Sequence, residues 1–215
     1  MEFKREQLEL YAITDRAWLG NETLAEQVEK ALKGGATMVQ LREKHLEREK
    51  FLEEAKEILP LCHRYQVPLI INDDVALAKE VGADGVHIGQ GDMALAAAKQ
   101  ILGEDAIIGV TAKTIDQARA AETAGATYLG SGAVFATNTK ADAKPMSLDL
   151  FQEICASVSI PVVAIGGISA NNLYSLKGRK MAGIAVVSGI FASADIEAET
   201  RRLRQKMDDI LEKGI

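Results

Sequence analysis

Residues 69–88 read LIINDDVALAKEVGADGVHI, and this stretch holds two short apolar runs separated by a helical segment. The runs at Leu69–Asn72 and Gly85–Ile88 are typical of buried strands. Gly82 and Ala83 stand just before the second run, and glycine suits the left-handed position that ends a helix. Strand, helix and strand in this order predict two parallel strands joined by a right-handed crossover.

The same unit recurs from end to end of the chain. Eight candidate strands follow one another, at residues 9–14, 38–41, 69–72, 85–88, 107–110, 128–131, 162–165 and 184–187. Most of the segments between them have the 3.6-residue apolar spacing of amphipathic helices, and the last helix is expected at residues 196–213. An open doubly wound sheet could also produce this repeat, but eight strands favour closure. We therefore expect an α/β fold, a single (β/α)8 TIM barrel that forms one domain over residues 1–215.

Composition excludes several classes of function. The formal net charge of -6 gives no basic field to attract nucleic acid or an anionic membrane. No apolar run approaches the roughly 20 residues of a membrane span, and the polar first residues do not form a signal peptide. We expect a cytoplasmic protein with Cys62 and Cys155 reduced, and its oligomeric state, including a homo-oligomer, stays open.

Carboxylates follow two neighbouring predicted strands. Asp73 comes directly after the third strand, and Asp92 leaves the fourth. The carboxyl ends of parallel strands lie about 4.8 Å apart and form the active-site face of a barrel, so the two side chains can share one ion. Oxygen ligands of this kind suit Mg²⁺. Asp73 and Asp74 could instead serve only as helix caps, and it is Asp92 that favours a metal site.

Cations follow the second strand and lie in the long connection at residues 135–145. Arg42 and Lys44 flank Glu43, and Lys140 lies in that connection, which is predicted to be a functional rim loop. Arginine offers a planar fork and lysine a mobile charge for phosphate oxygens. A solvated charge run is the alternative interpretation of residues 42–44.

Glycine-containing turns follow the last two strands. Gly166 and Gly167 are expected to lead into a helix, and Ser188 and Gly189 into a short one. Many barrels bind phosphate at these two places, through backbone N–H groups and the helix dipole. An ordinary turn is the alternative at each. His87, on the fourth strand, is expected to be a packed or stacking side chain rather than a general base.

Six motifs, in the same order along the chain, resemble the bacterial thiamine-phosphate synthase family. They are VQLREK at 39–44, IND at 71–73, GADGVHIGQGDM at 82–93, IIGVTAKT at 107–114, VFATNTK at 134–140 and VVAIGGI at 162–168. The resemblance implies a Mg²⁺-dependent enzyme that joins hydroxymethylpyrimidine diphosphate to hydroxyethylthiazole phosphate. The products would be thiamine phosphate and pyrophosphate.

The resemblance also implies roles for particular residues. Asp73 and Asp92 would hold the metal, and the catalytic groups would be Arg42, Lys44, Thr111 and Lys140. The pyrimidine diphosphate would lie among Gln40, Arg42, Lys44, Asn72, Thr111 and Lys140, with Leu41 and Glu43 also counted as substrate-binding. The thiazole phosphate would lie among Thr137, Thr139, Gly167, Val187 and Ser188, with Asn138 beside them.

Some positions depart from the family pattern, and two other functions stay open. Asp74 stands where relatives often have Arg, Ala133 and Asn138 replace frequent prolines, and Thr111 replaces a common Ser. A thiazole tautomerase-like paralogue should have lost part of the diphosphate site, yet all its predicted residues are present. A non-catalytic barrel that binds thiamine precursors would be recognised by binding without turnover.

Overall fold

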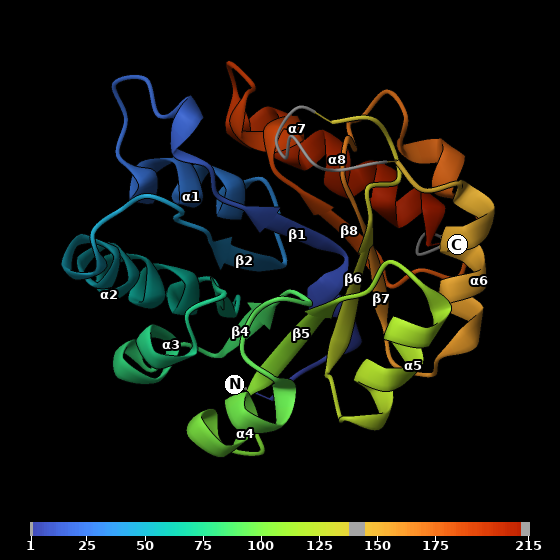
Figure 1. Ribbon diagram of the computed structural model, residues 1–215. Coiled ribbons are helices and arrows are strands. Elements are labelled where there is room, and N and C mark those ends of the chain that lie inside the picture. Colours follow the sequence, from blue (N-terminus) through green and yellow to red (C-terminus); the bar gives the residue numbers. More distant parts are fainter. Residues whose placement is uncertain (1, 138–144, 212–215) are drawn as a thin grey trace.

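The computed structural model describes residues 2–137 and 145–211, which form a closed barrel of parallel strands (Figure 1). Each strand pairs with the next one along the chain, and β8 pairs with β1 to close the barrel. This confirms the predicted (β/α)8 TIM barrel, and no predicted strand end differs from the observed one by more than one residue. The strands are β1 (Leu10–Ile13), β2 (Met38–Leu41), β3 (Leu69–Asn72), β4 (Gly85–Ile88), β5 (Ile107–Thr111), β6 (Tyr128–Gly132), β7 (Val162–Ile165) and β8 (Gly183–Val186).

Helices cover the outside of the barrel in Figure 1, and α1 packs against both α2 and α8, so the first and last helices lie side by side. Within the described ranges, no helix is long and apolar enough to cross a lipid bilayer. The helices are α1 (Leu24–Lys33), α2 (Arg48–Arg64), α3 (Val75–Val81), α4 (Leu95–Leu102), α5 (Ile115–Thr123), α6 (Leu148–Ser157), α7 (Ser188–Phe191) and α8 (Ile196–Ile210), and 3-10 turns occupy Arg5–Leu8, Arg16–Trp18 and Leu173–Leu176.

The α-helix expected after β7 is replaced by the 3-10 turn Leu173–Leu176. Asn172 explains the difference, because its side chain takes part in a local turn. Its Oδ1 accepts a hydrogen bond from the Ser169 N–H at 2.9 Å, and its Nδ2 donates to the Gly167 carbonyl at 2.7 Å. Such side-chain bonds to nearby backbone compete with the helix.

Two apolar cores result from the alternation of side chains along the strands. The larger core lies between the sheet and the helices, and both cysteines are buried without a disulfide. Burial raises the pKa of the Cys62 and Cys155 thiols to about 12. The smaller core fills the inside of the barrel and includes Tyr11, Ile70 and Tyr128.

An ion pair ties the start of the first strand to the last helix. Glu9 is buried, and its Oε2 lies 2.5 Å from the Arg204 guanidinium on α8. Arg204 also pairs with Asp208 at 3.0 Å. Because a buried carboxylate is costly without a charged partner, this contact should contribute more to stability than the exposed ion pairs of α8.

We therefore predict that Arg204→Ala lowers the free energy of unfolding by about 2 kcal/mol, measured by urea denaturation. The value stays below the full cost of breaking a buried pair because a quarter of the Arg204 side chain is exposed. Arg201→Ala is the matched control on the same helix, since Arg201 pairs with Glu197 at an exposed site, and it should cost less than about 0.5 kcal/mol. Equal losses in the two variants would contradict the prediction.

Candidate active site

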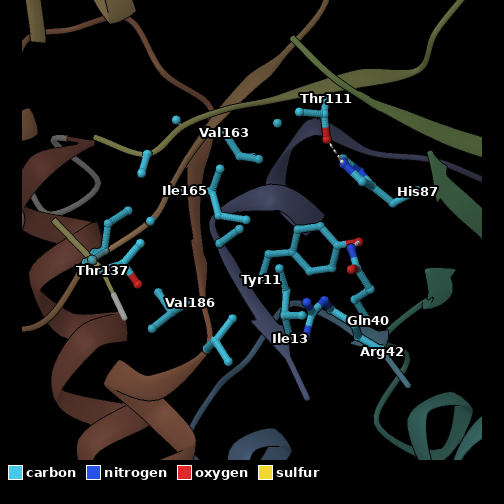
Figure 2. A pocket seen from close by; sticks show the side chains of 18 of the residues that line it. Tyr11, Ile13, Gln40, Arg42, His87, Thr111, Thr137, Val163, Ile165 and Val186 are labelled. Atoms are coloured by element: carbon cyan, nitrogen blue, oxygen red, sulfur yellow. Dashed lines mark hydrogen bonds between the residues drawn. The ribbon is translucent and has the colours of Figure 1, made fainter. Parts of the chain in front are cut away.

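A cavity of about 150 Å³ opens at the carboxyl ends of the strands (Figure 2). Polar side chains line it on the side of β2 to β5, and apolar ones line it on the side of β7 and β8. Eight residues predicted from the sequence lie on its wall: Gln40, Arg42, Asn72, Thr111, Thr137, Gly167, Val187 and Ser188. They lie on or after six different strands, so the barrel brings together positions spread over most of the chain.

Other predicted residues do not line this cavity. Side chains alternate along β2, so Gln40 and Arg42 face the cavity, whereas Leu41 is fully buried on the side of the helices. Glu43 pairs with Arg16 at 3.0 Å, and Lys44 is exposed away from the cavity wall. Of the two cations expected at the mouth, the structure thus brings Arg42 to the cavity wall and leaves Lys44 off it, and the Leu41 and Glu43 side chains do not line it either. The predicted residues Asn138, Thr139 and Lys140 lie outside the described part of the chain.

The end of β1 holds the end of β2 in place. Thr14 is fully buried; its N–H donates to the Gln40 carbonyl, and its Oγ1 accepts from the Arg42 N–H, both at 3.0 Å. Arg16 binds the carboxylates of Glu43 and of Glu54 on α2. Burial raises the pKa of Glu43, and the charge of Arg16 opposes that shift. These contacts fix the segment that carries Arg42 to the cavity.

The two adjacent aspartates after β3 have different roles. Asp74 is the N-cap of α3, because its Oδ1 accepts from the Leu77 N–H at 2.7 Å. Asp73 is exposed and has a left-handed backbone with φ of 63°. Its N–H donates to the His87 carbonyl of β4 at 2.9 Å. The capping interpretation therefore holds for Asp74 and leaves Asp73 at the rim.

Asp92 follows β4, the strand whose His87 carbonyl accepts the Asp73 N–H. Its Oδ2 accepts from the Gly89 N–H at 2.6 Å, and its side chain is exposed. Gly89 directly follows β4 and His87 lies within it, so both aspartates bind backbone at the carboxyl end of this strand. In the described residues no group of three or more His, Cys, Asp and Glu side chains could hold a metal. Two carboxylates at adjacent strand ends suit Mg²⁺, which keeps several waters and usually takes only one or two protein carboxylates.

The turns after β7 and β8 face the cavity together. Gly166 and Gly167 have φ of 99° and 66°, which side chains other than glycine rarely adopt. A Cβ on Gly167 would lie 2.3 Å from the Ala136 carbonyl oxygen, so the close approach also requires glycine. Ser188 begins α7 and lines the same cavity. This is the arrangement in which barrels bind phosphate.

Sequence reasoning missed two tyrosines here: Tyr11 lines the cavity, and Tyr128 is buried beside it inside the barrel. Tyr11 and Tyr128 point into the barrel and meet hydroxyl to hydroxyl at 2.9 Å. Burial raises the pKa of both phenols, so both keep their hydrogen. The His87 ring binds Tyr128 through Nδ1 at 3.1 Å and Thr111 through Nε2 at 3.0 Å. His87 is thus a packed, hydrogen-bonded side chain.

The sequence contained a pattern that could have drawn attention to these tyrosines. Barrel interiors are mostly filled by branched apolar side chains, so a tyrosine at an inward position is unusual. Lys113, which lines the cavity beyond β5, was also left out of the predicted site residues. Its position just after a strand could have identified it.

Comparison with known proteins identifies the family. Residues 10–190 match the family model described as thiamine monophosphate synthase. The thiamine-phosphate synthase of Ruminiclostridium cellulolyticum is 46% identical over 90% of this chain and 92% of its own length. That of Clostridium botulinum is 43% identical over 94% of both chains. A solved thiamine phosphate pyrophosphorylase from Pyrococcus furiosus superposes with a TM-score of 0.89 at 38% identity, over 96% of this chain and 98% of that one.

The chain belongs to the thiamine-phosphate synthase family. It is therefore a transferase of thiamine biosynthesis, as the six sequence motifs led us to expect. The barrel is shared more widely, because a solved protein of Streptococcus mutans, named KGPDC, superposes with a TM-score of 0.70 at only 15% identity. That second likeness concerns the fold alone.

In this member of the family, Gly109 on β5 makes room for Tyr128. A Cβ at position 109 would lie 2.1 Å from the Tyr128 Cζ inside the barrel. We predict that Gly109→Ala lowers the free energy of unfolding by about 3 kcal/mol in urea denaturation, because the ring cannot stay where it is. Gly91→Ala is the control, since nothing lies within 4 Å of the added Cβ, and it should change stability by less than about 0.5 kcal/mol. A stable Gly109→Ala protein would show that the Tyr128 ring can move at little cost.

Proposed function

We propose that this chain joins hydroxymethylpyrimidine diphosphate to hydroxyethylthiazole phosphate, releasing pyrophosphate and forming thiamine phosphate. One observation carries the proposal. Residues expected to bind the pyrimidine diphosphate, such as Gln40 and Arg42, line the same cavity as those expected to bind the thiazole phosphate, such as Gly167 and Ser188. A shared cavity lets two small substrates meet, which is what a condensation requires.

The proposed reaction needs no protein nucleophile. The bond between the pyrimidine methylene carbon and the diphosphate oxygen breaks, and the oxygen keeps the electron pair. The aminopyrimidine ring stabilises the methylene cation that remains. The thiazole nitrogen then donates its lone pair to that carbon, so the new C–N bond replaces the C–O bond and pyrophosphate departs. His87 agrees with this scheme, because both of its ring nitrogens are already hydrogen-bonded to Tyr128 and Thr111.

Charged and polar groups on one side of the cavity suit the departing diphosphate. Arg42 and Lys113 line the cavity and would bind phosphate oxygens as negative charge develops on them. Asp73 and Asp92 would hold Mg²⁺, which when bound neutralises part of that charge. On the opposite side, Val163, Ile165 and Val186 present apolar surface that would keep water from the cation.

The direct test is product formation with both substrates. Incubation with Mg²⁺, the pyrimidine diphosphate and the thiazole phosphate should yield thiamine phosphate and pyrophosphate in equal amounts. EDTA in excess of Mg²⁺ should stop the reaction. Binding of both substrates without any product would reject the proposal and favour a precursor-binding barrel.

The metal site is tested by Asp92→Ala. We expect turnover to fall at least about a hundredfold, because charge stabilisation at the leaving group is lost while the exposed position leaves the fold intact. Calorimetry in the presence of pyrophosphate should also show weaker Mg²⁺ binding, a readout that does not depend on turnover.

Asp105→Ala serves as the matched control for this variant. Asp105 is an exposed aspartate that precedes β5, at the opposite end of the strands from Asp92, and it should leave turnover and Mg²⁺ binding unchanged. Normal turnover of Asp92→Ala at every Mg²⁺ concentration would reject the metal role of Asp92.

A further inference from the structure

Five polar side chains form a continuous hydrogen-bonded chain across the floor of the cavity. Gln40 Nε2 donates to the Tyr11 hydroxyl at 2.7 Å, and the Tyr11 and Tyr128 hydroxyls lie 2.9 Å apart. Tyr128 lies 3.1 Å from His87 Nδ1, and His87 Nε2 lies 3.0 Å from the Thr111 hydroxyl. Figure 2 shows Gln40 beside Tyr11 and the bond between Thr111 and His87. The chain therefore begins and ends at side chains that line the cavity.

The hydrogens of this chain can be ordered from one end to the other. The Gln40 nitrogen can only donate, so the Tyr11 oxygen accepts there and keeps one hydrogen of its own. Tyr11 is almost fully buried, and an unsatisfied buried hydroxyl is costly, so that hydrogen goes to Tyr128. Tyr128 in turn donates to His87 Nδ1. The ring hydrogen of His87 is then on Nε2 and points to Thr111.

The strands leave space for this chain to form. A Cβ on Gly109 would collide with the Tyr128 ring, and one on Gly130 would lie 3.1 Å from the His87 Cε1. Burial also raises the pKa of Tyr11 and Tyr128, which keeps both hydroxyls protonated as donors. The glycines, the tyrosines and the histidine thus act as one packed unit.

The order of hydrogens determines what the floor offers to a ligand. The Gln40 side-chain nitrogen points to Tyr11, so the side-chain carbonyl oxygen is the atom that can accept a hydrogen bond from a ligand. Thr111 accepts from His87, so its own hydrogen can be donated to a ligand. An aminopyrimidine matches this pattern, because its amino group donates and its ring nitrogen accepts. An oxopyrimidine has the opposite pattern, a carbonyl oxygen beside a ring N–H.

We propose that Tyr11 and Tyr128 are positioning residues that make this site select an amino-substituted pyrimidine over its oxo counterpart. They act through Gln40 at one end of the chain and through His87 and Thr111 at the other. The inference rests on the proposed function, since it concerns the pyrimidine substrate of that same site. The hydrogen-bonded chain would explain how the site distinguishes two pyrimidine rings of nearly equal shape.

Selectivity is measured with the pyrimidine diphosphate and its 4-oxo analogue, each with the thiazole phosphate and Mg²⁺. The unaltered protein should favour the amino compound by at least about a hundredfold in kcat/KM. In Tyr11→Phe the ring still fills the barrel, but the Gln40 amide is free to rotate and present either atom. The preference should then fall at least about tenfold.

Tyr174→Phe is the matched control for Tyr11→Phe. Tyr174 is an exposed tyrosine outside the barrel that binds Asp209, so its loss should leave the preference unchanged. An unaltered preference in a folded Tyr11→Phe protein overturns the inference.

A second readout does not depend on turnover. Nitrogen NMR of the imidazole rings should show His87 with hydrogen on Nε2 in the unaltered protein. The chain has three histidines, so replacing His45 and His63 isolates the signal. Tyr128→Phe removes the donor to Nδ1, and the Nδ1–H form should then appear. A ring that carries its hydrogen on Nδ1 in the unaltered protein would overturn the hydrogen order and with it the inference.

The outcomes separate this inference from the proposed function. If thiamine phosphate forms from the amino compound and Tyr11→Phe keeps the preference of the unaltered protein, the proposed function is supported and the inference is contradicted. If neither pyrimidine gives product, the proposed function and the inference are both contradicted. Product formation with the expected loss of preference and the expected His87 form supports both.

Discussion

Tyr11 and Tyr128 meet hydroxyl to hydroxyl in the middle of the barrel, and most of the site depends on that contact. It joins β1 to β6 across the interior, where these strands are not neighbours in the sheet. The two rings meet edge to face, with centroids 5.9 Å apart, and fill the space below the cavity. Because a buried hydroxyl must be bonded, the pair recruits Gln40 and His87, and these two side chains form the polar part of the floor. The atoms that pack the barrel interior are therefore the same atoms that the proposed ligand recognition uses.

The strand order and the closure of the barrel could be predicted because they rest on local patterns. Short apolar runs such as Leu69–Asn72 are buried on both faces, and a Gly-Ala pair before several of them ends the preceding helix, as Gly82 does in its left-handed conformation. The missing helix after β7 shows the limit of such patterns. There the Asn172 side chain bonds to nearby backbone, and composition alone does not reveal which way a side-chain amide turns.

The place of the candidate site in the barrel could be predicted better than the side chains that line it. The rule that barrel sites follow the strands pointed to Arg42, and the family motifs pointed to Gln40 and Asn72; all three line the cavity. It did not separate Leu41 from its neighbours, although strict alternation along β2 would have done so. The family resemblance implies a binding role for Glu43, and nothing in the sequence near Glu43 reveals its ion pair with Arg16, 27 positions away. Tertiary contacts of this length have no local signature. The contact between Tyr11 and Tyr128, 117 positions apart, is hidden for the same reason, although the inward position of each tyrosine can be read from its strand.

The tie between Glu9 and Arg204 spans 195 positions, and β1 also needs β8 as its second neighbour in the sheet. A ribosome releases the chain from its first residue onward, so β1 is made long before either partner exists. During synthesis one edge of β1 lacks strand pairing until β8 is made, and the neighbouring Glu9 carboxylate lacks its partner until Arg204 is made. Non-local closure of this kind is slow compared with helix formation. The nascent chain must therefore keep an open sheet edge from pairing wrongly until β8 has been made, and this is when protection by chaperones would matter most.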